Sequence, residues 1–163
     1  MNIVELLIGL AEIAIALAGF TGVVVAFGSR SEGSWHPGDR LRLVFLLEAS
    51  LTAAGFSLLA LLAHAAIDDP QRGWALMSGL WAAYMTWSLW ASHTRIQDNS
   101  DAHGDIDKIA NRLIGTLFGA LVVVQVVNAA WWQVFPPFLA AVMLNLAGAA
   151  MQFARLIRSA FHE

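Results

Sequence analysis

The sequence predicts an all-α integral membrane protein, a bundle of five transmembrane helices with the N-terminus outside and the C-terminus in the cytoplasm. Three observations predict this class. The 163 residues are 58% hydrophobic and only 13% charged, which is more apolar than a soluble domain of this size can bury. Five apolar stretches reach the roughly 20 residues that cross about 30 Å of hydrocarbon. The basic residues fall almost entirely on one side of the resulting topology.

The composition also excludes several classes of protein. The net charge is −3 and the sequence has no basic stripe, so we expect no nucleic-acid partner. The chain has no cysteine, which excludes disulfides and thiolate metal sites. No repeat or composition shift divides the chain. We therefore expect a single transmembrane domain over residues 1–163, surrounded by the lipid bilayer.

The first span is expected at residues 3–28. It has no basic n-region, and Glu5 and Glu12 fall inside it, so it is interpreted as a retained helix and not as a signal peptide. The other spans are expected at about residues 40–67, 74–93, 109–130 and 136–157. The breaks between them carry turn residues or polar runs, and the last span begins at Pro136-Pro137, which suits the first turn of a helix.

The orientation follows from the basic residues, because short loops rich in Lys and Arg stay in the cytoplasm. With five spans, the side that holds the N-terminus carries Arg72 alone. The other side carries Arg30, Arg40, Arg42, Arg95, Lys108, Arg112, Arg155 and Arg158. This bias predicts an N-terminus outside and a C-terminus in the cytoplasm.

Two carboxylic side chains fall at membrane depth. At 1.5 Å per residue, Glu12 lies about 13 Å from the outer end of its span, near the midplane. Glu48 lies about six residues beyond Arg42, in the inner third of the membrane. Ionisable residues at such depths are costly, which makes them candidates for function.

Polar residues of the other spans are expected at the same depths as Glu12 and Glu48, so that each glutamate would belong to a polar layer. A midplane layer would combine Glu12, Ser57, Tyr84 and Asn145. A second layer would combine Glu48 with Gln152, and Arg112 would reach toward Glu48 from below. Asn145 and Gln152 are seven residues apart and share one helix face. These residues would either form a proton or cation pathway or lock the helices together by hydrogen bonds.

Small residues recur at spacings that let helix backbones approach closely. They pack helices within one protomer or between protomers. The candidates are Ala14, Ala18, Gly19, Gly22, Gly115 and Gly119. A homo-oligomer or a larger membrane complex is therefore expected.

No catalytic motif, metal site or cofactor site is expected. The acidic loop at residues 98–107 lacks the ligand spacing of a calcium loop. His64 and His93 fall on opposite sides of the membrane, so one haem could not bridge them. The function predicted is a non-enzymatic one, a small oligomeric channel or proton/cation pathway that uses the buried carboxylates. The alternative is a non-catalytic accessory or assembly subunit of a larger membrane complex.

Two segments carry a resemblance to known proteins. One is Ala11-Glu12 followed by Leu17-Ala18-Gly19-Phe20-Thr21-Gly22-Val23. The other is Trp35 with Asp39-Arg40-Leu41-Arg42 and Leu47-Glu48-Ala49-Ser50. Together they resemble a group of uncharacterised small bacterial polytopic membrane proteins, over about the first third of the chain. The resemblance implies a bacterial inner-membrane protein and assigns no functional residue.

Overall fold

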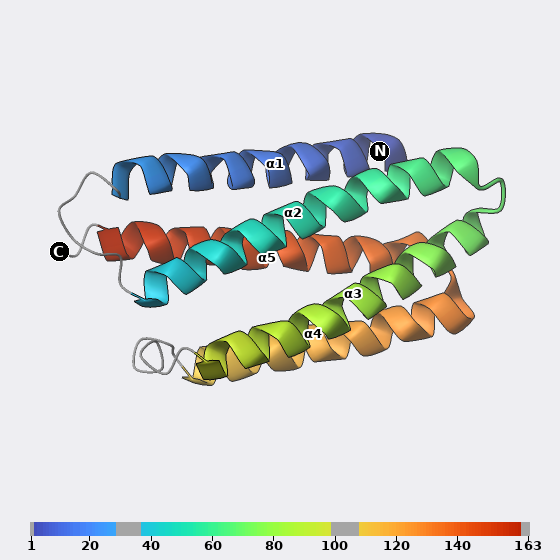
Figure 1. The fold of residues 1–163 in the computed structure, drawn as a ribbon. Helices are drawn as coiled ribbons and strands as arrows, with labels where there is room; N and C mark the ends of the chain where they lie inside the picture. Colours follow the sequence, from blue (N-terminus) through green and yellow to red (C-terminus); the bar gives the residue numbers. More distant parts are fainter. Residues whose placement is uncertain (1, 29–36, 99–107, 161–163) are drawn as a thin grey trace. The chain divides into compact units, whose positions relative to one another are not determined.

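The computed structural model describes residues 2–28, 37–98 and 108–160, which form five α-helices and one π-helical turn, without strands (Figure 1). The predicted all-α class is confirmed. In chain order the helices are α1 (Ile3–Gly28), α2 (Pro37–Ala66), α3 (Pro70–Asp98), α4 (Lys108–Val127) and α5 (Phe135–Ala160). The π-helical turn η2 (Asn128–Trp132) continues α4. Positions 99–107 of the acidic loop, considered above for calcium, lie outside the described residues.

Four helical segments in the described part of the chain are long and apolar enough to cross a membrane, and they indicate a membrane protein. They are Ile3–Val23, Arg40–Ala66, Arg112–Trp132 and Phe135–Arg158. Helix α3, expected as a span at residues 74–93, is a longer helix of 29 residues and is not among the four. Its Trp, Ser and Thr residues lower its mean hydropathy. The fifth crossing and the orientation therefore stay predictions.

Helix α1 begins with a reciprocal cap. Asn2 Oδ1 accepts a hydrogen bond from the Val4 backbone N–H at 3.2 Å. Glu5 Oε2 in turn accepts one from the Asn2 backbone N–H at 3.4 Å. This is the capping-box arrangement, in which two otherwise unpaired donors of the first turn are satisfied. Glu5 therefore has a local role in starting α1.

Helix α3 begins at a proline that follows a capping aspartate. Pro70 occupies the first helical position, where its missing N–H removes no helix bond. The carboxylate of Asp69 accepts the Gln71 backbone N–H at 3.0 Å and lies 3.2 Å from Arg72 Nε. The ion pair is exposed and adds little stability. The cap explains the sharp start of α3 after the short link from α2.

The contacts divide the chain into two compact units: unit 1, residues 1–61 and 142–163, and unit 2, residues 62–141. In unit 1, α1 and α5 run in one direction and α2 in the other (Figure 1). Their shared core is a cluster of Leu46, Ala149 and Leu156, surrounded by the partly buried side chains of Leu17, Leu43, Ala49 and Phe153. The rings of Phe20 and Phe153 also meet, 6.0 Å apart. All three helices therefore contribute to one apolar core.

In unit 2, helix α3 packs along α4 and η2. The buried Trp74 joins the start of α3 to the start of α5, with ring centroids 4.8 Å from Phe135 and 6.0 Å from Phe138. His64, near the end of α2, stacks on the same tryptophan at 6.1 Å. Aromatic contacts of this kind contribute about 0.5–1.5 kcal/mol each beyond their buried area. Trp74, near the start of α3, therefore contacts aromatic residues near the end of α2 and at the start of α5.

Candidate functional site

Four polar residues on α2 and α5, all within unit 1, form the candidate site. Ser50 and Ser57 are fully buried on α2. Asn145 is buried on α5, and Gln152 is half-buried with its side-chain oxygen fully enclosed. We call these four residues the polar ladder.

The polar ladder lies on the sides of α2 and α5 that face each other. A spacing of seven residues places the two serines on one face of α2, about 10 Å apart along the axis, and the same holds for the two amides on α5. Leu46 is one turn before Ser50, and Ala149 lies between Asn145 and Gln152. Leu46 and Ala149 belong to one buried cluster. The two polar faces are therefore turned toward one another.

Every member of the polar ladder has a buried polar atom without a hydrogen-bond partner among the described residues. These atoms are Ser50 Oγ, Ser57 Oγ, Asn145 Nδ2 and Gln152 Oε1. The set combines an amide donor, an amide acceptor and two hydroxyls that do both. Buried polar groups are costly unless they are hydrogen-bonded, most of all within hydrocarbon. The arrangement is suited to hold small hydrogen-bonding species, and water is the smallest.

Two more polar residues of unit 1 differ from the polar ladder. Glu48 is half-buried on α2, two residues before Ser50, and is the ionisable group nearest to the polar ladder along that helix. Thr21 is buried on α1, but its hydroxyl donates to the Leu17 carbonyl oxygen at 3.1 Å. The hydroxyl group of Thr21 therefore makes its hydrogen bond within its own helix, as is common for threonine in membrane helices.

The other residues singled out from the sequence lie elsewhere. Glu12 is exposed on α1, whereas Ser57 and Asn145 of the expected midplane layer are buried. Tyr84 is half-buried and Arg112 exposed, and both belong to unit 2. The structure thus groups Ser57, Asn145 and Gln152 on the facing sides of α2 and α5. It places Glu12 on the outside of unit 1.

The small residues expected to pack helices divide into two groups. Ala14 is fully buried and Ala18 half-buried on α1. A Cβ added at the glycines would meet no atom within 4 Å, which holds for Gly19, Gly22, Gly115 and Gly119. Within the described chain, these four glycines are therefore not points where another backbone approaches closely.

Sequence analysis missed a polar cluster in unit 2 that is built around the π-helical turn. Asn128 Nδ2 donates to Ser78 Oγ at 2.8 Å and to the Val134 carbonyl oxygen at 2.9 Å, and Asn128 Oδ1 accepts from the Val134 N–H at 3.1 Å. Gln125 Nε2 donates to the Pro137 carbonyl oxygen at 2.7 Å. The available signal was two amides three residues apart in an otherwise apolar run. The cluster fixes the link between α4 and α5.

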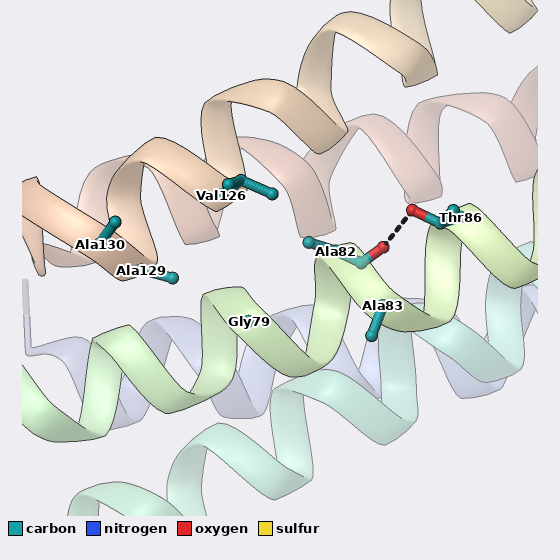
Figure 2. Close-up of a pocket in the computed structure, with 7 residues that line it drawn as sticks. All are labelled: Gly79, Ala82, Ala83, Thr86, Val126, Ala129 and Ala130. Carbon is teal, nitrogen blue, oxygen red and sulfur yellow. Dashed lines mark hydrogen bonds between the residues drawn. The ribbon is translucent and has the colours of Figure 1, made fainter.

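Unit 2 also has a groove between α3 and the end of α4 with η2 (Figure 2). Its volume is about 610 Å³, and its lining is Gly79, Ala82, Ala83, Thr86, Val126, Ala129 and Ala130. Among these seven residues only Thr86 has a polar side chain, and its hydroxyl donates back to the Ala82 carbonyl oxygen at 2.8 Å (Figure 2). The groove therefore offers a surface of methyl groups and helix backbone.

Comparison of the chain with protein-family models, with curated proteins and with solved structures gives no match. Four apolar helices define the class, a helical membrane protein. Its function is inferred from the described side chains.

Proposed function

We propose that the protein conducts protons or small cations across a membrane through the polar ladder of unit 1. The observation that supports this function is the row of buried, unpartnered polar atoms on two helices that are otherwise apolar. Unpartnered polar groups in the interior of a membrane bundle are costly, and bound water is one way to satisfy them. Water held between the hydroxyls and amides would relay the charge, and Glu48 is the nearest ionisable group on α2 that could exchange protons with this water.

The physical reason for this choice is the mixture of donors and acceptors. A side chain that locks helices together satisfies its own hydrogen bonds, as Asn128 does with Ser78 and Val134, although Gln125 Oε1 in the same cluster has no partner among the described residues. Ser57 and Asn145 have not done so. Unused hydrogen-bonding capacity at consecutive levels of one helix pair is what a relay of water molecules requires.

Proton flux in proteoliposomes with a pH-sensitive dye inside tests the proposal. We expect the wild-type protein to dissipate an imposed pH gradient and Asn145→Leu to slow the flux at least about tenfold. Glu48→Gln should reduce it as well. Met143→Leu, a change at an exposed position on the same helix, is the matched control and should leave the flux unchanged. Wild-type vesicles that are no leakier than empty vesicles would overturn the proposed function.

The same proposal includes five crossings of a bacterial inner membrane, with the N-terminus outside. Arg40 and Arg42 in the first turns of α2, and Arg155 and Arg158 in the last turns of α5, support one cytoplasmic side. Tags at the two termini give the test, because five crossings place them on opposite sides and four crossings place them on the same side. Protease access to both tags from one side would reject α3 as a span.

A further inference from the structure

The register of α2 against α5 follows from the apolar core that the two helices share in unit 1. Leu46 of α2 packs in one buried cluster with Ala149 and Leu156 of α5. The level of Leu46 along the bundle therefore lies between the levels of these two residues. Because α2 and α5 run in opposite directions (Figure 1), a later residue of α2 lies level with an earlier residue of α5.

The four residues of the polar ladder consequently alternate between the two helices along the bundle. Ser50 follows Leu46 by four residues, so it lies between the levels of Asn145 and Gln152. Ser57 follows Leu46 by eleven residues and lies beyond Asn145. The order along the bundle is therefore Gln152, Ser50, Asn145 and Ser57.

The distance between the two hydroxyl groups matches a short file of water molecules. Ser50 and Ser57 are about 10 Å apart along the axis of α2, and hydrogen-bonded oxygens lie roughly 2.8 Å apart, so about three water molecules would link them. Asn145 lies at a level between the two serines. Its Nδ2 is buried and has no partner among the described residues, so it can donate a hydrogen bond to the middle of such a file.

We propose that the polar ladder passes protons and excludes metal cations. This inference names the ion of the proposed pathway and rests on that proposed function. Each water molecule and each serine hydroxyl accepts a proton on one side and releases another on the opposite side, so the charge moves while the oxygen atoms stay in place. Asn145 Nδ2 and Gln152 Oε1 hold the water molecules in line by hydrogen bonds, and the two amides keep their own protons.

Metal cations need more oxygen ligands than the polar ladder holds. Ca²⁺ takes about six to eight oxygen ligands in proteins, and potassium filters replace the hydration shell of the ion with rings of backbone carbonyls. The polar ladder has one side-chain oxygen at each level, and none of its members is ionisable. Between the levels, Ala53 and Ala149 are fully buried and add only methyl groups. A metal cation that lost its water here would gain little in return, which is costly for a buried charge.

The membrane potential of proteoliposomes tests this selectivity. Vesicles with the wild-type protein and a voltage-sensitive dye receive either a proton gradient at equal K⁺ and Na⁺, or a K⁺ or Na⁺ gradient at equal pH. We expect the proton gradient alone to produce a potential. A potential from the K⁺ or Na⁺ gradient would overturn the exclusion of metal cations and leave a cation pathway standing. Vesicles that respond to no gradient, like empty vesicles, would overturn the proposed function together with this inference.

A pair of serine variants tests the order of the polar ladder. Without the Ser50 hydroxyl, the file is interrupted between Gln152 and Asn145, so Ser50→Ala should slow proton flux by the same factor as Asn145→Leu. Ser78→Ala is the matched control, because Ser78 is also fully buried but belongs to the polar cluster around Asn128 in unit 2. It should leave the proton flux unchanged. Equal proton flux in the two serine variants would exclude a relay through Ser50.

Discussion

Asn128 donates a hydrogen bond from its side-chain nitrogen to Ser78 Oγ at 2.8 Å, and this contact joins the π-helical turn to α3 across fifty positions of the sequence. Both residues are fully buried. The same amide also pairs with the N–H and carbonyl of Val134, the residue just before α5. The side chain of Asn128 therefore hydrogen-bonds both to the link between η2 and α5, at Val134, and to α3, at Ser78.

The first prediction concerns this contact. Asn128→Ala removes three hydrogen bonds and leaves the backbone of Val134 without its partner, so it should lower the free energy of unfolding by about 2–3 kcal/mol. Ser78→Ala removes one bond and should lower it by about 0.6–1 kcal/mol. Reversible unfolding in mixed micelles measures both. If Ser78→Ala lowered the free energy of unfolding as much as Asn128→Ala does, the bonds of Asn128 to Val134 would not be the larger part of its contribution.

The second prediction concerns the residue that ends the π-helical turn. Gln133 has a φ of 53° and ψ of 41°, in the left-handed region, and its N–H donates to the Asn128 carbonyl oxygen at 2.7 Å. A side chain costs about 1 kcal/mol in this conformation and glycine does not. Gln133→Gly should therefore raise the melting temperature. Gln133→Val should lower it, and the opposite order of the two variants would exclude backbone strain at this position.

The third prediction concerns Gly79 of α3, which faces Ala129 of η2. A Cβ added at Gly79 would lie 3.9 Å from Ala129 Cβ, which is ordinary contact, so Gly79→Ala should be tolerated. The larger side chain of Gly79→Leu can extend into the groove that Gly79 lines, so its cost should stay below the roughly 1–3 kcal/mol that is typical of overpacking in a filled core. Gly115→Leu is the control, because a Cβ there meets no atom within 4 Å. Thermal unfolding of the three variants in detergent distinguishes these outcomes.

The fourth prediction concerns Trp81, the largest fully buried side chain. Its indole Nε1 is enclosed and has no hydrogen-bond partner among the described residues. Trp81→Phe keeps a six-membered aromatic ring in the core and removes the unpaired N–H donor. The free energy of unfolding should therefore change by less than about 1 kcal/mol. Trp81→Ala should lower it by about 3–5 kcal/mol through the cavity that it leaves. A loss of similar size in both variants would show that the N–H is paired in the membrane.

Much of the fold was predictable from the sequence, because apolar length and turn residues act locally. The first span was expected at residues 3–28, and α1 covers Ile3–Gly28. The expected start at Pro136-Pro137 lies within one residue of the observed start at Phe135. The π-helical turn was not foreseen, and neither was the bond of its Asn128 to Ser78, fifty positions away in the sequence. Local sequence carries little information about such a contact.

The direction of each polar side chain was harder to predict than its depth. Depth follows from counting residues along a span, which grouped Glu12 with Ser57 and Asn145. The buried face of α1 cannot be found in this way, since apolar residues surround Glu12 on every side of the helix. Only the folded structure, in which Leu7 and Ala14 are buried, identifies their face of α1 as the inner one. Burial of Ser57 and Asn145 likewise follows from the register of α2 and α5.

The short connection after η2 has a consequence for synthesis of the chain. Only Gln133 and Val134 separate the apolar segment that ends at Trp132 from the one that begins at Phe135. Two residues cannot hold one segment across a bilayer while the next waits in water. We therefore expect the two segments to enter the membrane together and not one after the other.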